Sequence, residues 1–227
     1  MIKIVFENEN FIICDKPAQW LSVPDRFESD RPCLGLELQK QFGQQIFPVH
    51  RLDYEVSGLI IYAKNQKAHK VSQAWFQNKI IQKKYLGITS IKQDFSHWPK
   101  DKPCASQPIE ALADQSFFWA MKILRGKKRS YESAHGELSE TEAVIKKIEL
   151  NQWLYWDLYP ITGKAHQLRL ELSRHGFPLV GDKLYGSKIE VQQAGWNHSG
   201  IALRAVQIAF NDCQVERLGL PAETILQ

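Results

Sequence analysis

Alternation of apolar and polar positions at the start of the chain predicts two strands, at residues 2–6 and 11–14, joined by a polar turn at 7–10. A continuous apolar run at 58–63 is typical of a buried strand. The pattern predicts further strands, at residues 85–89, 117–123, 141–149, 153–160 and 201–210. Strands therefore dominate the expected fold.

Helical spacing of apolar or large side chains appears at 66–79, where Ala68, Val71, Ala74 and Trp75 recur. Two more helices are expected, at about 33–42 and 164–175. Residues 91–115, with three prolines, and the basic stretch 126–130 are expected to be loops. Because neither a repeat nor a linker divides the chain, the sequence predicts a single α+β domain over 1–227.

The composition is that of an ordinary globular protein, with 44% hydrophobic and 24% charged residues among 227. No run of 18 apolar residues and no signal peptide is found, so we expect no membrane partner and a cytoplasmic location. The four cysteines lie far apart, which predicts reduced thiols and no metal site. The net charge of +4 suits a polyanionic partner without requiring one.

Two polar segments carry candidate chemistry. Residues 49–58 place Asp53 in a polar cluster just before the buried strand at 58–63, where a fold can hold a reactive side chain rigidly. In residues 161–169, His166 and Arg169 would share one face of the expected helix. These residue types alone indicate a site built from a carboxylate and an arginine.

The chain also resembles the RluA-type pseudouridine synthases over about residues 10–210, in the order of that family's motifs. The residues that carry the resemblance are 15–17 (Asp-Lys-Pro), 50–53 (His-Arg-Leu-Asp) with 57–59 and 63–64, 84–86 (Lys-Tyr-Leu), and 162–169 with 176–186. The resemblance implies the pseudouridine-synthase α+β fold, a long, mixed and mostly antiparallel sheet flanked by helices and loops, with the active site in a central cleft. It implies the compact form, without an N-terminal S4-type domain.

The implied activity is isomerisation of a flipped-out uridine in a structured RNA, a stem-loop of tRNA or rRNA. Asp53 would be the catalytic carboxylate, which attacks the sugar or the base or takes a ribose proton. Arg169 would pair with Asp53 and hold it ionised, and Tyr85 would lie beside the uracil as a candidate for removal of the C5 proton.

Three further residues would bind substrate. By the same resemblance, Arg51 would fill the place that the base vacates, Leu168 would form an apolar wall, and Lys164 would contact phosphate. An isomerisation requires no external donor, and the chain lacks the glycine-rich nucleotide motifs, so no cofactor is expected. Nothing in the sequence demands more than a monomer.

The sequence departs from the family pattern at three places. Val56 stands where threonine is usual, Gln19 where glycine is common, and Lys164-Ala165 where arginine-threonine is usual. The first two changes affect packing or loop shape. The third weakens a bidentate phosphate contact, because lysine binds phosphate as a point charge. His50 and His166 are expected to be structural hydrogen-bond partners, and the basic run 125–129 is either a solvated loop or a phosphate contact.

Two other functions remain open from the residues. A non-catalytic RNA-binding module would retain the scaffold but lose Asp53 or its partners, and this chain keeps them. A nucleoside or glycoside hydrolase would need a second carboxylate near Asp53, for which Glu55 is the candidate.

Overall fold

The computed structural model describes residues 2–25, 30–98, 112–150, 152–211 and 213–226. The chain forms two compact units. The first unit comprises residues 1–83, 198–200 and 204–227, and the second comprises 84–197 and 201–203. Each unit has its own strands, helices and buried core.

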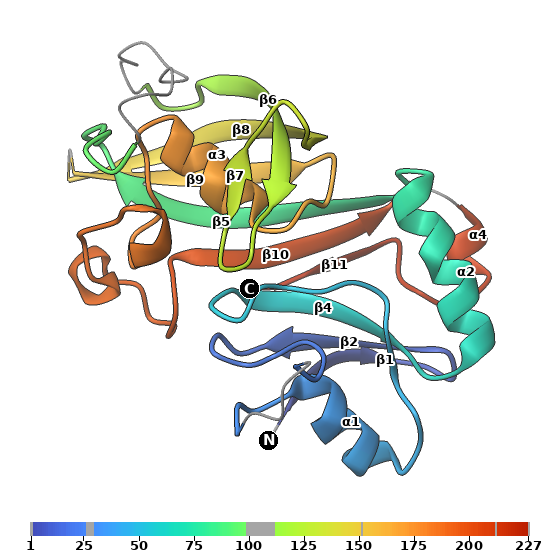
Figure 1. Ribbon diagram of the computed structural model, residues 1–227. Coiled ribbons are helices and arrows are strands. Elements are labelled where there is room, and N and C mark those ends of the chain that lie inside the picture. The colour runs from blue at the N-terminus through green and yellow to red at the C-terminus, as the bar shows by residue number, and fades with distance from the viewer. Residues whose placement is uncertain (1, 26–29, 99–111, 151, 212, 227) are drawn as a thin grey trace. The chain divides into compact units, whose positions relative to one another are not determined.

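The first unit is a mixed sheet with helices on both faces (Figure 1). Its elements are β1 (Lys3–Glu7), β2 (Phe11–Lys16), α1 (Leu34–Phe42), β3 (Phe47–Pro48), β4 (Ser57–Ala63), α2 (Gln66–Gln77), β10 (Leu203–Phe210, whose first residue belongs to the second unit), α4 (Cys213–Glu216) and β11 (Glu223–Ile225). The strands run in the order β1-β2-β4-β10, and β3 and β11 add to β4 and β10. The β4–β10 pair is parallel, and the other pairs within this unit are antiparallel.

Successive side chains of β2 and β4 point to opposite faces of the sheet, and both faces are covered. One set of alternating side chains packs with Trp75 of α2 into an apolar cluster, and its strand members are Phe11, Ile13, Leu59, Ile61 and Ala63. The opposite face carries Tyr62, whose ring lies beside Gly35 of α1. Two helices therefore cover two faces, which is why residues 58–63 read as one continuous apolar run.

A glycine lets β4 and β10 approach closely. Gly58 has φ +115°, and a Cβ there would lie 2.1 Å from the carbonyl oxygen of Ala205, its partner in the parallel pair. Only glycine fits both the backbone angle and the space. This pairing fixes the start of β4, which directly follows the segment that carries Asp53.

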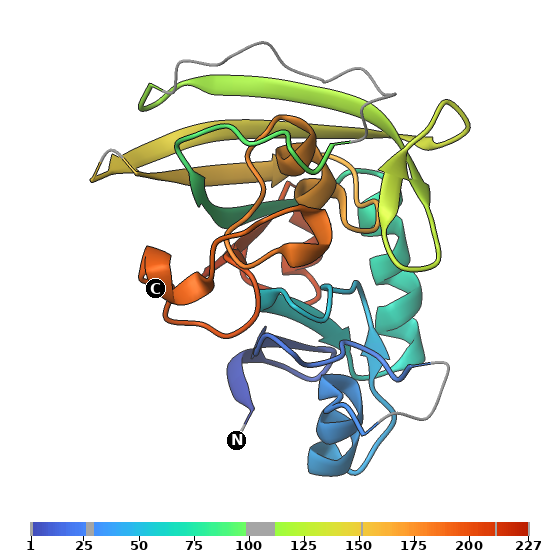
Figure 2. The ribbon, with the colours of Figure 1, turned by 60° about the vertical axis from the view of Figure 1, so that its left-hand side comes forward.

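The second unit is an antiparallel sheet of long strands (Figure 2). Its elements are β5 (Ile81–Ser90, whose first three residues belong to the first unit), β6 (Ser116–Arg125), β7 (Ser130–Glu132), β8 (Glu137–Glu149), β9 (Trp153–Pro160), α3 (Gln167–Arg174) and the 3-10 turns η1 (Lys183–Tyr185) and η2 (Val191–Ala194). The strand order is β5-β9-β8-β6-β7. Helix α3 packs on β6, β7, β9 and η1.

Most predicted elements are present, and the α+β class with its mixed, mostly antiparallel strands is confirmed. The strand at 153–160 has the predicted bounds, whereas β5 begins four residues earlier than predicted. The described parts of the predicted loop at 91–115 contain neither helix nor strand. The three prolines of this loop fall within residues 99–111, which lie outside the described residues. The single-domain organisation stays a prediction.

The observed helices add detail to the prediction and correct one part of it. In α2 the buried side chains are Ala68, Ser72 and Trp75, and the Ser72 hydroxyl donates to the His69 carbonyl, while Val71 is 41% exposed. Helix α3 begins at Gln167, not at 164, since His166 has φ +56° and lies outside the helix. His166 and Arg169 therefore do not share a helical face.

Candidate active site

Asp53 lies on a turn that hydrogen bonds fix from both sides. The Val56 amide donates to the Asp53 carbonyl at 3.2 Å and closes the turn. On the preceding residue, the Leu52 amide donates to Ser22 Oγ at 3.0 Å, and the Ser22 hydroxyl donates back to the Leu52 carbonyl at 2.9 Å. The backbone around the Asp53 carboxylate is therefore rigid, as a reactive group requires.

A buried ammonium group supports the same turn. Lys16 is 0% exposed, and its Nζ lies 2.9 Å from the Pro17 carbonyl oxygen, 2.8 Å from that of Trp20 and 3.5 Å from that of Tyr54. Burial lowers the pKa of Lys16 to about 8, against the opposing charges of Asp53 and Glu55. The charges of Asp53 and Glu55 thus favour the ammonium form of Lys16.

The family's usual glycine position is occupied by Gln19, and its backbone shows why glycine is common there. Gln19 has φ +61°, in the left-handed region that glycine enters without strain. The Gln19 amide donates to the Tyr54 carbonyl at 2.7 Å, next to Asp53. The substitution thus keeps the loop shape and costs about 1–2 kcal/mol of backbone strain.

Two hydrogen bonds from Arg204 hold the strand that follows the turn. Arg204 Nη1 donates to Ser57 Oγ at 3.1 Å, and Nη2 donates to Asp15 Oδ2 at 2.6 Å. Ser57 is the first residue of β4, so the arginine links β2, β4 and β10 at the end of the strand nearest Asp53. Val56, which replaces the usual threonine, is 3% exposed and packs in the core.

The other two predicted catalytic residues belong to the second unit. Tyr85 is 9% exposed and pairs with Leu158 across β5 and β9. Arg169 is 1% exposed on α3 and binds Asp182 through two bonds, from Nε to Oδ2 at 2.7 Å and from Nη2 to Oδ1 at 2.9 Å. The Arg169 guanidinium also lies 5.3 Å above the centre of the Tyr185 ring.

Sequence reasoning gave no role to Asp182, Tyr185 or Lys16, although each lies in a motif segment that it quoted. The signal was the residue type: a charged side chain beside the apolar residues of a buried strand or helix needs a polar partner. Asp182 is the partner of Arg169, and backbone carbonyls are the partners of Lys16. Asp182 lies outside the helix that carries Arg169, and the partners of Lys16 are backbone atoms, so the side-chain pattern identifies neither partner.

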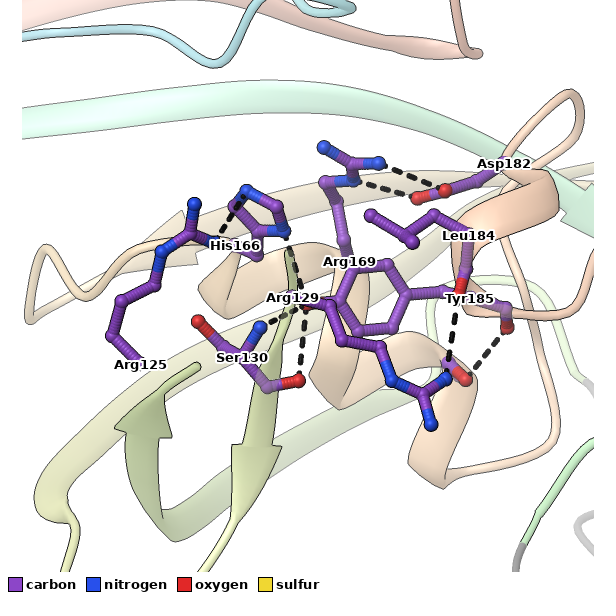
Figure 3. Close-up of polar contacts among 9 residues, drawn as sticks. Arg125, Arg129, Ser130, His166, Arg169, Asp182, Leu184 and Tyr185 are labelled. Atoms are coloured by element: carbon purple, nitrogen blue, oxygen red, sulfur yellow. Dashed lines mark hydrogen bonds and ion pairs between the residues drawn. The ribbon is translucent and has the colours of Figure 1, made fainter. Parts of the chain in front are cut away.

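Both histidines of the motifs are hydrogen-bond partners. His50 Nε2 accepts from the Ile61 amide at 3.1 Å, and burial followed by the charge of Lys83 lowers the pKa of His50 to about 3. His166 contacts the Tyr185 hydroxyl through Nδ1 at 3.0 Å and Arg125 through Nε2 at 2.9 Å (Figure 3). Each ring joins segments distant in sequence.

The three predicted substrate-binding residues differ in exposure. Arg51 is exposed, Leu168 is buried in α3, and Lys164 is partly exposed and forms an ion pair with Glu137. That pair lowers the pKa of Glu137 through the hydrogen bond and charge of Lys164. The positions of Arg51 and Lys164 leave both cations accessible to solvent.

Helix α3 carries a second buried charge beside Arg169. Glu171 is 0% exposed and accepts from Ser139 Oγ at 2.9 Å and Thr141 Oγ1 at 2.5 Å, both on β8. Burial raises the pKa of Glu171 to about 7, against the two hydrogen bonds and the charge of Arg174. These bonds fasten α3 to the sheet, and so restrict how far Arg169 can move.

The family comparison agrees with this arrangement of motifs. The RNA pseudouridylate synthase family matches residues 10–174, which contain Asp53, Tyr85 and Arg169. This chain belongs to that family. Pseudouridine synthases are isomerases that convert uridine to pseudouridine in RNA, and the predicted enzyme class is confirmed.

Curated pseudouridine synthases resemble the chain over most of its length. It is 31% identical to the dual-specificity RNA pseudouridine synthase RluA of Vibrio vulnificus over 81% of this chain and 68% of that protein. It is 30% identical to an uncharacterized RNA pseudouridine synthase of Mycoplasma pneumoniae over 92% of this chain and 62% of that one. A Helicobacter pylori synthase is 35% identical, and the match covers 81% of this chain and 58% of that one. The chain thus spans less than two thirds of the latter two relatives.

Solved structures show the same fold. The chain superposes on the human RNA pseudouridylate synthase domain containing 1 with a TM-score of 0.69 and 19% identity, over 100% of this chain and 83% of that one. The human protein named RNA pseudouridylate synthase domain containing 4 gives a TM-score of 0.67 at 17% identity, over 99% of this chain and 88% of that one. The pseudouridine-synthase fold is therefore confirmed.

Two features are absent from the described part of the chain. No helix there is long and apolar enough to cross a membrane. No group of three or more His, Cys, Asp or Glu residues there is arranged to hold a metal ion. The roles of the individual site residues, and their meeting in one cleft, stay predictions.

Proposed function

We propose that this protein isomerises a specific uridine of a structured RNA to pseudouridine, with Asp53 as its catalytic carboxylate. The observation that carries the proposal is that hydrogen bonds fix the backbone on both sides of Asp53. Ser22 bonds Leu52 before it, and the Val56 amide closes the turn after it. Loops that serve only as connections rarely have a buried hydroxyl and a buried lysine devoted to them.

The chemistry needs one carboxylate and one route for a proton. The N1–C1′ bond breaks, the uracil turns, and C5 joins C1′. The C5 proton then leaves and N1 gains a proton, so the product has the composition of the substrate. Asp53 attacks the sugar or the base, or takes a ribose proton. Tyr85, buried on a regular strand, is the candidate for handling the C5 proton.

Arg169 is proposed as the partner of the Asp53 carboxylate. A guanidinium offers five N–H donors, and Asp182 takes two of them, on the Nε–Nη2 edge. A buried arginine that is already aligned by one carboxylate can orient another without first losing side-chain entropy. The supporting observation is this alignment within the second unit.

Contacts with RNA are proposed for Arg51, Leu168 and Lys164. Exposed Arg51 can reach into an RNA helix, and Leu168 offers an apolar wall to the base. The Lys164–Glu137 ion pair is exposed to solvent and therefore weak, so a phosphate can displace Glu137. The substrate we propose is a stem-loop of tRNA or rRNA, bound by a cytoplasmic monomer.

Mapping of pseudouridine in total RNA tests this function. Cells with and without the gene are compared, and the deletion is complemented with the wild type, Asp53→Ala or Glu55→Gln. We expect the deletion to lose a discrete pseudouridine, which the wild type and Glu55→Gln restore and Asp53→Ala does not. Restoration by Asp53→Ala would contradict the catalytic role, and an unchanged map would contradict the activity. Release of free uracil by the purified protein would indicate a hydrolase.

A further inference from the structure

The turn between β6 and β7 gathers four cations within five residues. Arg125, Lys127, Lys128 and Arg129 are all exposed, and the Gly126 amide donates to the Arg129 carbonyl at 3.0 Å to close the turn. We call residues 125–129 the basic hairpin. So dense a positive charge on a narrow turn suits the phosphates of an RNA strand.

The basic hairpin is firmly attached to the part of the fold that carries Arg169. On β7, Glu132 accepts two bonds from Arg174 of α3, at 2.7 and 2.8 Å. The Ser130 hydroxyl donates to the Ala165 carbonyl at 2.6 Å. Strand β7 is therefore fixed both to α3 and to the segment that precedes it.

A directional chain of hydrogen bonds runs from this hairpin to Tyr185 (Figure 3). The Arg125 Nη1–H can only donate, so His166 Nε2 accepts and carries no proton. His166 Nδ1 then carries the proton and donates to the Tyr185 oxygen, whose hydroxyl donates to the Ser130 carbonyl at 3.2 Å. The Ser130 amide donates back to that oxygen at 2.8 Å.

Tyr185 joins this chain to Arg169. Its ring face lies under the Arg169 guanidinium at 5.3 Å, and the side chain belongs to a buried cluster with Met121, Ile123 and Leu170. Its carbonyl accepts from Ser173 Oγ at 2.8 Å. Tyr185 is thus held at its hydroxyl, its ring and its backbone, and any movement of the ring changes the surroundings of Arg169.

We propose that His166 and Tyr185 are positioning residues, through which RNA phosphate bound at Arg125 of the basic hairpin stabilises the orientation that Asp182 gives to Arg169. This inference rests on the proposed function for its effect on catalysis. The physical basis is that Arg125 can make two interactions at once. Its Nη1–H donates to His166, and its exposed positive charge is accessible to a phosphate. Binding energy at the hairpin then contributes to orientation at the site.

A double-mutant cycle tests the proposal. Pseudouridine formation on an unmodified RNA substrate is measured for Arg125→Ala, Tyr185→Phe and the double variant. We expect each single variant to lower the rate at saturating RNA about tenfold, and the double variant to lose no more than either, because both break one chain. Tyr185→Phe keeps the ring and its packing, so a merely structural role predicts no loss of rate. Losses that multiply to about a hundredfold would overturn the proposal.

Lys128→Ala is the matched control for charge. It removes one cation from the same hairpin, and we expect it to raise the RNA concentration needed for half-maximal rate without lowering the maximal rate. If Arg125→Ala behaves like Lys128→Ala, the proposal is wrong. His166→Asn is a second variant, since asparagine tolerates the left-handed backbone at this position, and it should match Arg125→Ala.

A measurement without RNA separates failure of this inference from failure of the proposed function. The ¹H–¹⁵N signal of Arg169 Nε is compared between the wild type and the variants. We expect Arg125→Ala, His166→Asn and Tyr185→Phe to shift it and Lys128→Ala to leave it unchanged. If the wild type forms no pseudouridine, the proposed function fails while this signal still tests the coupling. An unmoved signal in all variants would overturn the coupling itself.

Discussion

Arg169 and Asp182 form a bidentate ion pair, with N–O distances of 2.7 and 2.9 Å, and both side chains are only 1% exposed. The pair joins α3 to the residue that precedes η1. Because a buried guanidinium needs a counter-charge, Asp182 allows Arg169 to exist at this position. It also fixes the plane of the guanidinium, and with it the directions of the other N–H groups.

Loss of the Asp182 charge should destabilise the protein strongly. Asp182→Asn keeps the shape but removes the buried charge that binds the Nε–Nη2 edge of Arg169, and we expect the free energy of unfolding to fall by about 3–5 kcal/mol in urea titrations. Asp114→Asn is the control, because Asp114 forms an exposed pair with Lys146 at 3.2 Å and should lose less than about 1 kcal/mol. Equal losses in the two variants would contradict the role of the buried pair.

Gly58 should tolerate no side chain. In Gly58→Ala the new Cβ would meet the Ala205 backbone at 2.1 Å and the residue would keep φ +115°, so we expect a loss of more than ~3 kcal/mol in unfolding free energy. Gly43→Ala separates the two causes, since Gly43 has φ +62° but nothing within 4 Å of the new Cβ. It should lose only about 1–2 kcal/mol. A loss in Gly58→Ala as small as that in Gly43→Ala would show that the strands can separate.

Local patterns were sufficient for most of the fold. The strand at 153–160 alternates strongly and has the predicted bounds, and the apolar run at 58–63 is the buried strand β4. The short strands β3, β7 and β11 were not predicted, because two or three residues carry no period and become strands only by pairing with β4, β6 and β10.

The site could be predicted only in part, for a related reason. The motifs drew attention to Asp53 and Arg169, but the start of α3 depends on His166, whose left-handed backbone is stabilised by bonds to Tyr185 and Arg125. Those partners lie 19 and 41 residues away along the chain. A helical pattern in the sequence records none of these tertiary bonds, so it overestimates the length of the helix.

Restoring glycine at the strained position in the first motif should stabilise the protein. Gln19→Gly relieves the φ of +61° and keeps the amide that donates to Tyr54, and we expect a gain of up to about 1 kcal/mol after the added chain entropy of glycine. Gln19→Ala, which keeps the strain, should give no gain. Thermal unfolding of the three proteins measures this, and a stabilised alanine variant would contradict the explanation.

His50 should make stability depend on pH in mildly acid solution. Its pKa falls from 6.5 to about 3 on folding, so between these values the unfolded chain binds more protons and the free energy of unfolding decreases as the pH falls. His50→Gln keeps an acceptor for the Ile61 amide but does not titrate. Relative to this variant, the wild type should lose about 1.4 kcal/mol per unit between pH 6 and pH 4 in urea titrations. A difference that stays constant with pH would contradict a His50 that stays neutral in the folded protein.

Release of tritium from uridine labelled at C5 tests the central claim most directly. The purified wild type, Asp53→Asn and Glu55→Gln are incubated with an RNA transcript that carries the site found by mapping. We predict that the wild type and Glu55→Gln release tritium in step with pseudouridine formation, whereas a folded Asp53→Asn is slower by more than ~1000-fold. Release by Asp53→Asn at the wild-type rate would contradict the assignment of Asp53 as the catalytic carboxylate.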